Sequence, residues 1–267
     1  MLTVRSERVR VARKLRRRAA RQKAGLFLVE GPQAVAEAVA RPDLLVELFA
    51  TPEAASRHDG MIASAPVPVQ LADEAAVASL SETVTPQGLV AVCRQVTVGL
   101  DEALAGQPTL VAVMVEVRDP GNAGTVIRCA DAAGANAVII AGDSVDPHGG
   151  KCVRASAGSL FHLPVVAGVP PAQAVRALRG RRMSVLAADG AAATDLDRAE
   201  DDGILSRPTA WLFGNEASGL PEDVRALADQ IVRIPIHGRA ESLNLAAAAA
   251  VCLYASARAR RRDRRAS

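Results

Sequence analysis

Six short apolar segments in the second half of the chain constrain its fold more than any other feature. They are residues 109–117, 137–140, 163–166, 183–188, 209–213 and 230–236. Each has the length of a strand, and a nearly continuous apolar run is typical of a strand buried on both faces of a parallel sheet. Segments with helical periodicity are expected between and after them, at 123–133, 149–157, 171–179, 221–228 and 242–258. This alternation predicts an α/β fold with helices on both faces of a parallel sheet.

A smaller α/β unit is expected ahead of this sheet. Its predicted strands are residues 26–30, 44–50, 67–71 and 88–93. Alanine-rich segments between them read as helices, and the composition then shifts towards Gly and Pro, as in a linker. We therefore predict an N-terminal domain at 1–98, a linker at 99–107 and a second domain at 108–267.

Arginine and lysine are concentrated at the two ends of the chain, although the formal net charge is only +3. The N-terminal run is predicted to be helical, with Val4, Val11 and Leu15 on one face. Clustered cations favour a polyanion, because binding to phosphates releases condensed counterions. Nucleic acid is therefore the predicted partner, with candidate contacts at Arg13, Arg16 and Arg17. The alternative is that a GC-rich gene has replaced lysine by arginine at chain ends that are merely solvated and frayed. This alternative is stronger for the arginines of residues 258–265.

Several classes of protein are excluded by what the sequence lacks. The four cysteines are far apart and the four histidines share no ligand spacing, so we expect neither a disulfide framework nor a metal. This cysteine usage predicts a reducing, cytoplasmic location. The longest apolar stretch, 243–257, is too short to cross a bilayer and carries Asn244, so no membrane role is expected. Dinucleotide-binding, P-loop and nucleophile-elbow motifs are also missing.

Ligands of parallel sheets bind outside the carboxyl ends of the strands, which points to the loops after residues 117, 140, 188, 213 and 236. Three of these loops are unusual. In the first, a turn ends at Asn122, a good N-cap residue, and Arg128 follows on an otherwise apolar helix. An arginine in that setting suits an anion, but it could equally pair with Glu116 or Asp131 on the surface.

The second and third unusual loops bear small and polar residues. Gly214 and Gly219 bracket Glu216, so that backbone amides could approach a ligand closely while a carboxylate accepts hydrogen bonds from it. A simple turn with a solvated glutamate is the alternative. In the third loop, Ser242 is a plausible N-cap. Asn244 follows two residues later, and capping by Ser242 does not explain why a poor helix former occupies that position.

Taken together and in this order, the three loops resemble the three motifs of the SpoU (TrmH) branch of the SPOUT RNA methyltransferases. The matching segments are "DPGNAGTVIRCADAAGA", "LFGNEASGL" and "IPIHGRAESLNLAAAAAVCLY". The stretch "KCVRASAGSLFHLPV" also resembles the family, so the likeness covers essentially all of residues 108–258. The segment "LFLVEGPQAVAEAV" resembles the small α/β RNA-binding domain that many members carry ahead of the catalytic domain.

The resemblance implies several features that periodicity alone does not. The family fold has a deep trefoil knot at its C-terminal end, an exception to the rule against knots. It also implies a homodimer and S-adenosylmethionine as cofactor, with Trp211 as strand packing. The cofactor residues implied are Leu212, Gly214, Asn215, Ile234, Pro235, Ile236 and Leu243.

The reaction implied is methylation of a ribose 2′-hydroxyl of RNA, with 23S ribosomal RNA favoured by the separate N-terminal domain. The catalytic residues implied are Arg128, Asn122, Glu216, Ser242 and Asn244. A guanidinium is a poor base, so we expect Arg128 to orient the hydroxyl, although the family's proposal that it accepts the proton stays open. Candidate RNA contacts are Lys151, Arg154 and Ser156. The alternatives are tRNA 2′-O-methylation and a non-catalytic RNA-binding protein on the same scaffold.

Overall fold

The computed structural model describes residues 1–266, with side chains up to residue 263. The chain forms two compact units, which we describe separately. Unit 1 comprises Met1–Val96 and Asp146–Phe161, and unit 2 comprises Thr97–Val145 and the chain from His162 onward. The packing of Asp146–Phe161 with the N-terminal unit was not expected from the sequence, which assigned this segment to the second domain.

Unit 2 is built on a seven-stranded sheet in the order β7-β6-β5-β10-β8-β11-β9. Its strands are β5 (Leu110–Val115), β6 (Ala137–Ala141), β7 (Val165–Val169), β8 (Ser184–Ala188), β9 (Thr194–Asp195), β10 (Thr209–Phe213) and β11 (Gln230–Arg233). Every neighbouring pair is parallel. The parallel α/β sheet predicted from the apolar segments is therefore confirmed.

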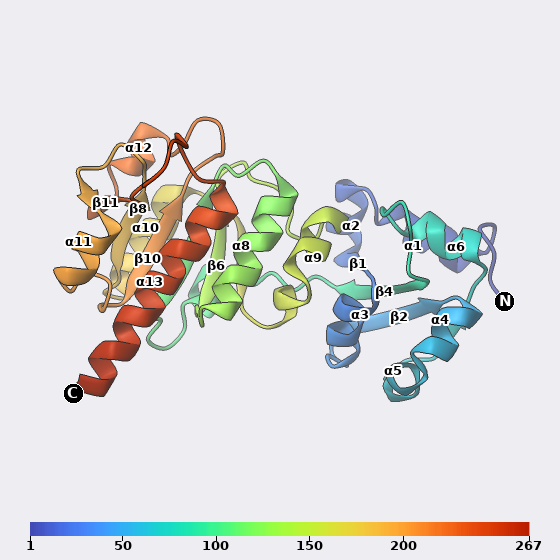
Figure 1. The fold of residues 1–267 in the computed structure, drawn as a ribbon. Helices are drawn as coiled ribbons and strands as arrows, with labels where there is room; N and C mark the ends of the chain where they lie inside the picture. Colours follow the sequence, from blue (N-terminus) through green and yellow to red (C-terminus); the bar gives the residue numbers. More distant parts are fainter. Residues whose placement is uncertain (267) are drawn as a thin grey trace. The chain divides into compact units, whose positions relative to one another are not determined.

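Helices cover both faces of this sheet (Figure 1). They are α7 (Leu100–Ala103), α8 (Pro120–Ala132), α10 (Pro171–Gly180), α11 (Leu196–Asp201), α12 (Glu222–Arg225) and α13 (Leu245–Ala266). Helices α8 and α13 lie side by side over β5 and β10, whereas α10 packs on the opposite face. None of the helices in residues 1–266 combines the length and the apolar character that crossing a membrane requires.

Alternate residues of the central strands serve the two faces. Val113 and Leu212 point into the core beneath α10, and Trp211 points to the other face, where it is fully buried. The indole Nε1–H of Trp211 donates a 2.9 Å hydrogen bond to the hydroxyl of Ser256 on α13. Trp211 is thus a packing residue, as predicted, and it fixes α13 against the strand that leads into the second loop.

Unit 1 has a four-stranded mixed sheet in the order β1-β4-β2-β3. The strands are β1 (Leu26–Glu30), β2 (Leu45–Ala50), β3 (Val69–Leu71) and β4 (Leu89–Arg94). Strand β4 is antiparallel to both neighbours, and β2 and β3 are parallel. The helices are α1 (Glu7–Lys14), α2 (Arg18–Ala24), α3 (Pro32–Val39), α4 (Pro52–Arg57), α5 (Asp59–Ser64), α6 (Glu74–Leu80) and α9 (Gly150–Ser156), followed by a 3-10 turn at Ser159–Phe161.

The apolar face predicted for the N-terminal run is wrong at Val11. Val9 is fully buried beneath the sheet, whereas Val11 is 55% exposed. Val4 lies outside helix α1, which begins only at Glu7 and ends before α2, so its spacing to Val11 does not define a helical face. Leu15 is buried as expected, because it lies just after α1 and packs into the same core.

Several predicted boundaries in unit 2 also differ from the structure. The predicted strand 230–236 ends at Arg233, and the last helix begins at Leu245 and extends to Ala266. The predicted linker contains α7, and its residues Ala103 and Leu104 are buried in the core of unit 2. The side chains of Arg264 and Arg265, part of the C-terminal cationic run, lie outside the described residues.

A buried ion pair ties residues 146–161 to the N-terminal part of unit 1. Arg21 is only 6% exposed, and its guanidinium donates from Nη2 to Asp146 Oδ2 at 2.7 Å. The backbone N–H of His148 donates to the other carboxylate oxygen at 2.9 Å. Burial alone would raise the pKa of Asp146, but the hydrogen bonds from His148 and Arg21 outweigh it and hold the pKa well below its usual range.

This depressed pKa makes the stability of unit 1 sensitive to acid. The ionised form of Asp146 stabilises the fold above the unfolded-state pKa of about 3.9, and this contribution is lost as the pH falls below that value. We expect Asp146→Asn to lower the free energy of unfolding at neutral pH by about 3 kcal/mol, because Arg21 then lacks its buried partner. The variant should also lose less stability than the wild type on going to acid pH.

Urea unfolding followed by circular dichroism at neutral and acid pH measures both effects. Asp59→Asn, at an exposed position of α5, is the matched control and should behave as the wild type. Equal acid sensitivity of the wild type and Asp146→Asn would contradict the assignment.

Candidate functional site

The strand order of unit 2 brings together three of the loops singled out in the sequence. Strand β10 lies between β5 and β8, and β8 pairs with β11 on its other side. Because the strands are parallel, their carboxyl ends lie along the same edge of the sheet. The loops that follow β5, β10 and β11 therefore meet there, although they are far apart in the sequence.

The side chain of Asn122 connects these three loops. Its Nδ2 donates to Oε1 of Glu216 in the loop after β10 at 2.9 Å. Its Oδ1 accepts from Nδ2 of Asn244, which follows β11, at 3.1 Å. The prediction that Asn122 caps helix α8 is wrong: the cap is Asp119, whose carboxylate accepts the Asn122 N–H at 2.8 Å. Asn122 lies in the first turn, and its amide is available to bridge the loops.

Asn244, and not Ser242, caps helix α13. The Oδ1 of Asn244 accepts the N–H of Ala246 at 2.9 Å, and the helix begins at Leu245. Capping explains why a poor helix former occupies this position. Ser242 lies before the helix, is exposed, and lines the cavity described below.

The loop after β10 is a tight turn that closes on itself. Asn215 and Gly219 exchange two backbone hydrogen bonds, each 2.9 Å long. The Asn215 side chain donates to the carbonyl of Glu116 at 2.9 Å, which ties this loop to the end of β5. Glu116 itself has a positive φ of 54°, a strained conformation for a residue other than glycine. A Cβ atom on Gly214 would lie 2.2 Å from the Gly219 carbonyl carbon, so only glycine fits there.

These loops enclose a pocket of about 820 Å³ at the carboxyl edge of the sheet, a size typical of small-molecule sites. Among the predicted cofactor and catalytic residues, those that line it are Gly214, Asn215, Glu216, Ile234, Ile236, Ser242, Leu243 and Asn244. Ile236 and Leu243 are 38% and 39% exposed, which is unusual for large apolar side chains and fits a ligand that covers them. Leu212 is fully buried and Pro235 does not line the pocket, so only their backbone could serve a ligand.

The loop after β8 contributes pocket residues that no sequence motif had indicated. Asp189 and Gly190 line the pocket, together with Arg225 of α12. Arg225 lies 3.5 Å from the Asp189 carboxylate and also pairs with Glu222. The strand-end rule did point to this loop, but no motif distinguished it. The part of the chain that the structure describes holds no group of three or more His, Cys, Asp or Glu side chains suited to a metal ion.

Arg128 is on α8 and its side chain is exposed. The surface-pair alternative is wrong, since Asp131 instead contacts His162 at 2.7 Å, and Arg128 has no hydrogen-bond or ion-pair partner among the described side chains. It does not line the pocket of its own chain. The structure therefore brings Asn122, Glu216 and Asn244 together but leaves Arg128 separate from them.

Three of the predicted RNA contacts are exposed arginines, whereas Ser156 and Arg154 are engaged within the fold. Arg13, Arg16 and Arg17 are exposed on unit 1, as a phosphate-binding surface requires. Ser156 is fully buried and its hydroxyl donates to the Val153 carbonyl at 2.8 Å, so it cannot reach a phosphate in this conformation. Arg154 is paired with Glu30.

Comparison with known families matches both parts of the chain. Residues 109–254 match the SpoU rRNA Methylase family, and residues 6–91 match the MRM3-like substrate binding domain. The chain is 31% identical over 255 residues to the 23S rRNA (guanosine(2553)-2′-O)-methyltransferase RlmP of Bacillus subtilis, an alignment that covers 94% of this chain and 96% of that protein.

Solved structures of related enzymes share the fold over nearly all of the chain. The SpoU methyltransferase AviRb of Streptomyces viridochromogenes, in complex with AdoMet, superposes with a TM-score of 0.83 at 29% identity and covers 98% of this chain and 100% of that one. An AdoMet-bound rRNA methyltransferase of Sinorhizobium meliloti gives a TM-score of 0.81 at 28% identity, covering 96% and 97% of the two chains.

The tight turn after β10 predicts a position-specific effect of adding a methyl group. We expect Gly214→Ala to open the turn, because its Cβ has no space, and amide hydrogen exchange at Asn215 and Gly219 should then accelerate by tenfold or more, as each loses about 1.4 kcal/mol of protection. Gly190→Ala is the matched control, since it lines the same pocket with no atom within 4 Å of an added Cβ. Equal protection in the two variants would show that the turn is not closed in solution.

Proposed function

The chain belongs to the SpoU family of RNA 2′-O-ribose methyltransferases, and on that premise we propose that it methylates a ribose 2′-hydroxyl in 23S ribosomal RNA with S-adenosylmethionine as donor. The observation that supports this most strongly is the junction at Asn122, which joins the three family motifs around one pocket. The N-terminal match to a substrate-binding domain and the 23S rRNA relatives support the choice of RNA.

The residues of the pocket fit S-adenosylmethionine. The apolar side chains of Ile236 and Leu243 suit the adenine ring, and the closed turn at Gly214 lets backbone groups approach the ligand. The carboxylates of Asp189 and Glu216 suit ribose hydroxyls or the positively charged end of the molecule. The cofactor supplies an electrophilic methyl group on a positively charged sulfonium.

The protein's task is then to position and activate a weakly acidic alcohol. We assign this to Arg128, whose guanidinium can donate hydrogen bonds to the 2′-oxygen and a neighbouring phosphate and stabilise negative charge that develops on the oxygen. The hydroxyl proton passes to solvent when the oxygen accepts the methyl group. Asn122, Glu216 and Asn244 hold the three loops in register around the pocket. Ser242, exposed at the pocket wall, is a further candidate for contact with the substrate.

Arg128 does not line the pocket of its own chain, so the proposal includes the family's homodimer. In that arrangement the exposed Arg128 of one protomer completes the pocket of the other. The family's C-terminal trefoil knot, which would thread residues near Ile234 and Leu243 into the pocket wall, belongs to the same proposal. We further propose that a substrate domain at 1–98 binds the RNA and that a methyltransferase domain at 108–267 transfers the methyl group, in a cytoplasmic protein.

Mapping of ribose methylation tests the proposed function directly. Mass spectrometry of total RNA from a strain lacking the gene, beside its parent, should show one 2′-O-methyl mark lost from 23S rRNA. The purified protein with S-adenosylmethionine should restore that mark. Loss of a tRNA mark instead would show that the substrate is tRNA. If RNA methylation is unchanged both in the deletion strain and after addition of the purified protein, the chain would be a non-catalytic RNA-binding protein.

Arg128 should be needed for turnover but not for cofactor binding. We expect Arg128→Ala to reduce kcat by roughly 10² or more, the scale of a positioned catalytic group, with unchanged S-adenosylmethionine affinity. Arg176→Ala, at an exposed position of α10 on the opposite face, is the matched control. Unchanged turnover would remove Arg128 from the mechanism.

Mixed dimers then test whether the arginine acts across subunits. Ser218→Trp should block the pocket from an exposed lining position while leaving Arg128 intact. A dimer of Arg128→Ala with Ser218→Trp should recover activity, because one protomer keeps an open pocket and the other a working arginine. No recovery would place the arginine and the pocket on the same chain.

A further inference from the structure

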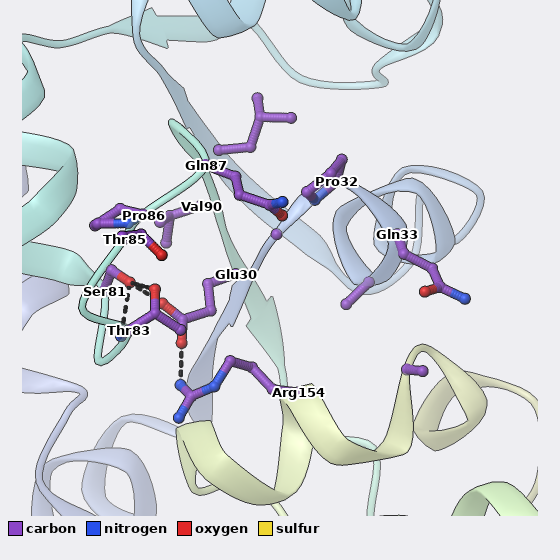
Figure 2. A pocket seen from close by; sticks show the side chains of 14 residues that line it. Glu30, Pro32, Gln33, Ser81, Thr83, Thr85, Pro86, Gln87, Val90 and Arg154 are labelled. Carbon is purple, nitrogen blue, oxygen red and sulfur yellow. Dashed lines mark hydrogen bonds and ion pairs between the residues drawn. The ribbon is translucent and has the colours of Figure 1, made fainter.

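Unit 1 contains a cavity of its own, of about 500 Å³, that the methyl-transfer site does not include (Figure 2). Its wall combines the junction of β1 and α3, the segment between α6 and β4, and helix α9. All of these elements belong to unit 1. The cavity is large enough for a nucleotide and too large to be a packing defect.

The charged groups of this cavity neutralise each other. Glu30 accepts hydrogen bonds from the Ser81 hydroxyl, from the Glu82 N–H at 3.1 Å and from the Arg154 guanidinium. Figure 2 shows the Glu30 and Arg154 side chains meeting at one side of the cavity. With its carboxylate satisfied in this way, the cavity has no charge left to attract a metal ion or a free cation.

The remaining groups are neutral and offer both donors and acceptors. Gln33 and Gln87 line the cavity, both are exposed, and neither side-chain amide hydrogen bonds to any part of the chain that the structure describes. In Figure 2 the Gln87 amide lies beside Pro32, and Gln33 lies on the far side of that ring. Each amide presents one acceptor and two donors, the combination that reads the edge of a nucleobase.

Apolar surfaces complete the wall. Pro32 and Pro86 contribute rigid rings to the lining, and Leu89 and Val90 add further apolar surface. A flat heterocycle buries its faces against such surfaces while its edge hydrogen bonds to the amides. An acidic or strongly basic ligand gains nothing from this lining, because the single ion pair is already closed.

We propose that this cavity receives one unstacked base of the RNA substrate, which the amides of Gln33 and Gln87 recognise. The proposal rests on the proposed function and specifies how unit 1 selects its RNA. Proteins that recognise RNA sequence mostly read bases that leave the stack in loops and bulges. The exposed arginines at 13, 16 and 17 on the same unit would bind the flanking phosphates.

Steady-state kinetics with transcribed, protein-free 23S rRNA test the site. We expect the double variant Gln33→Ala/Gln87→Ala to raise KM for the RNA by about tenfold, since two lost hydrogen bonds together amount to roughly one such factor. The kcat and the S-adenosylmethionine affinity should not change. Both residues are exposed, so folding should be unaffected. Gln70→Ala, half-exposed in β3 and outside the cavity, is the matched control.

An unchanged KM in the double variant overturns the proposal while leaving the methyltransferase function intact. A defect seen with assembled large ribosomal subunits, but not with protein-free rRNA, would assign the cavity to a ribosomal protein and also overturn it.

A second measurement does not depend on turnover. In 15N NMR spectra of the full chain titrated with adenosine, guanosine, cytidine and uridine 5′-monophosphates, the side-chain amide signals of Gln33 and Gln87 should shift with at least one of them. Shifts confined to the arginine-bearing helices α1 and α2 would show phosphate binding alone and contradict a base site. If the Gln33 and Gln87 signals shift but no RNA is methylated, the proposed function fails while the assignment of the cavity as a base-binding site stands.

Discussion

The site depends on the two hydrogen bonds of one short amide side chain. Asn122 donates to Glu216 at 2.9 Å and accepts from Asn244 at 3.1 Å, so it joins residues that lie 94 and 122 positions further along the sequence. An amide can do both at once, whereas a carboxylate would repel Glu216 and an aliphatic side chain would make neither bond. The same Asn244 also caps α13, which couples the loop after β11 to the longest helix of unit 2. The pocket is therefore shaped by a polar junction as well as by the sheet.

The parallel sheet was predictable from the sequence because burial on both faces leaves a direct mark, the nearly continuous apolar strands. The three loops were predictable because such sheets bind ligands at one edge. The caps were not predictable, because each helix start offers two good cap residues. Asp119 and Asn122 are three positions apart, Ser242 and Asn244 are two apart, and only the helix start decides between the members of each pair. Asp189 and the packing of residues 146–161 depend on contacts between distant segments, for which the sequence carries no local signal.

The two cavities described above have linings of different chemistry. The larger one, in unit 2, has exposed apolar side chains, carboxylates and a glycine that tolerates no Cβ, which suits a cofactor held against the backbone. The one in unit 1 has a closed ion pair and two amides that make no hydrogen bond to the described residues, which suits a neutral base. Each lining thus matches one of the two molecules that the reaction needs, a small methyl donor and a large RNA. Recognition of the RNA and binding of the donor can then be altered by separate substitutions.

Crystals of the full-length chain grown with S-adenosylhomocysteine, the demethylated product of the donor, test the central claim most directly. Density for the product should fill the pocket of unit 2, with its ring against Ile236 and Leu243 and its sulfur towards the junction of Asn122 and Glu216. A vacant pocket with the product bound at another place on the chain would contradict the assignment of the donor site, and with it the mechanism built on Arg128.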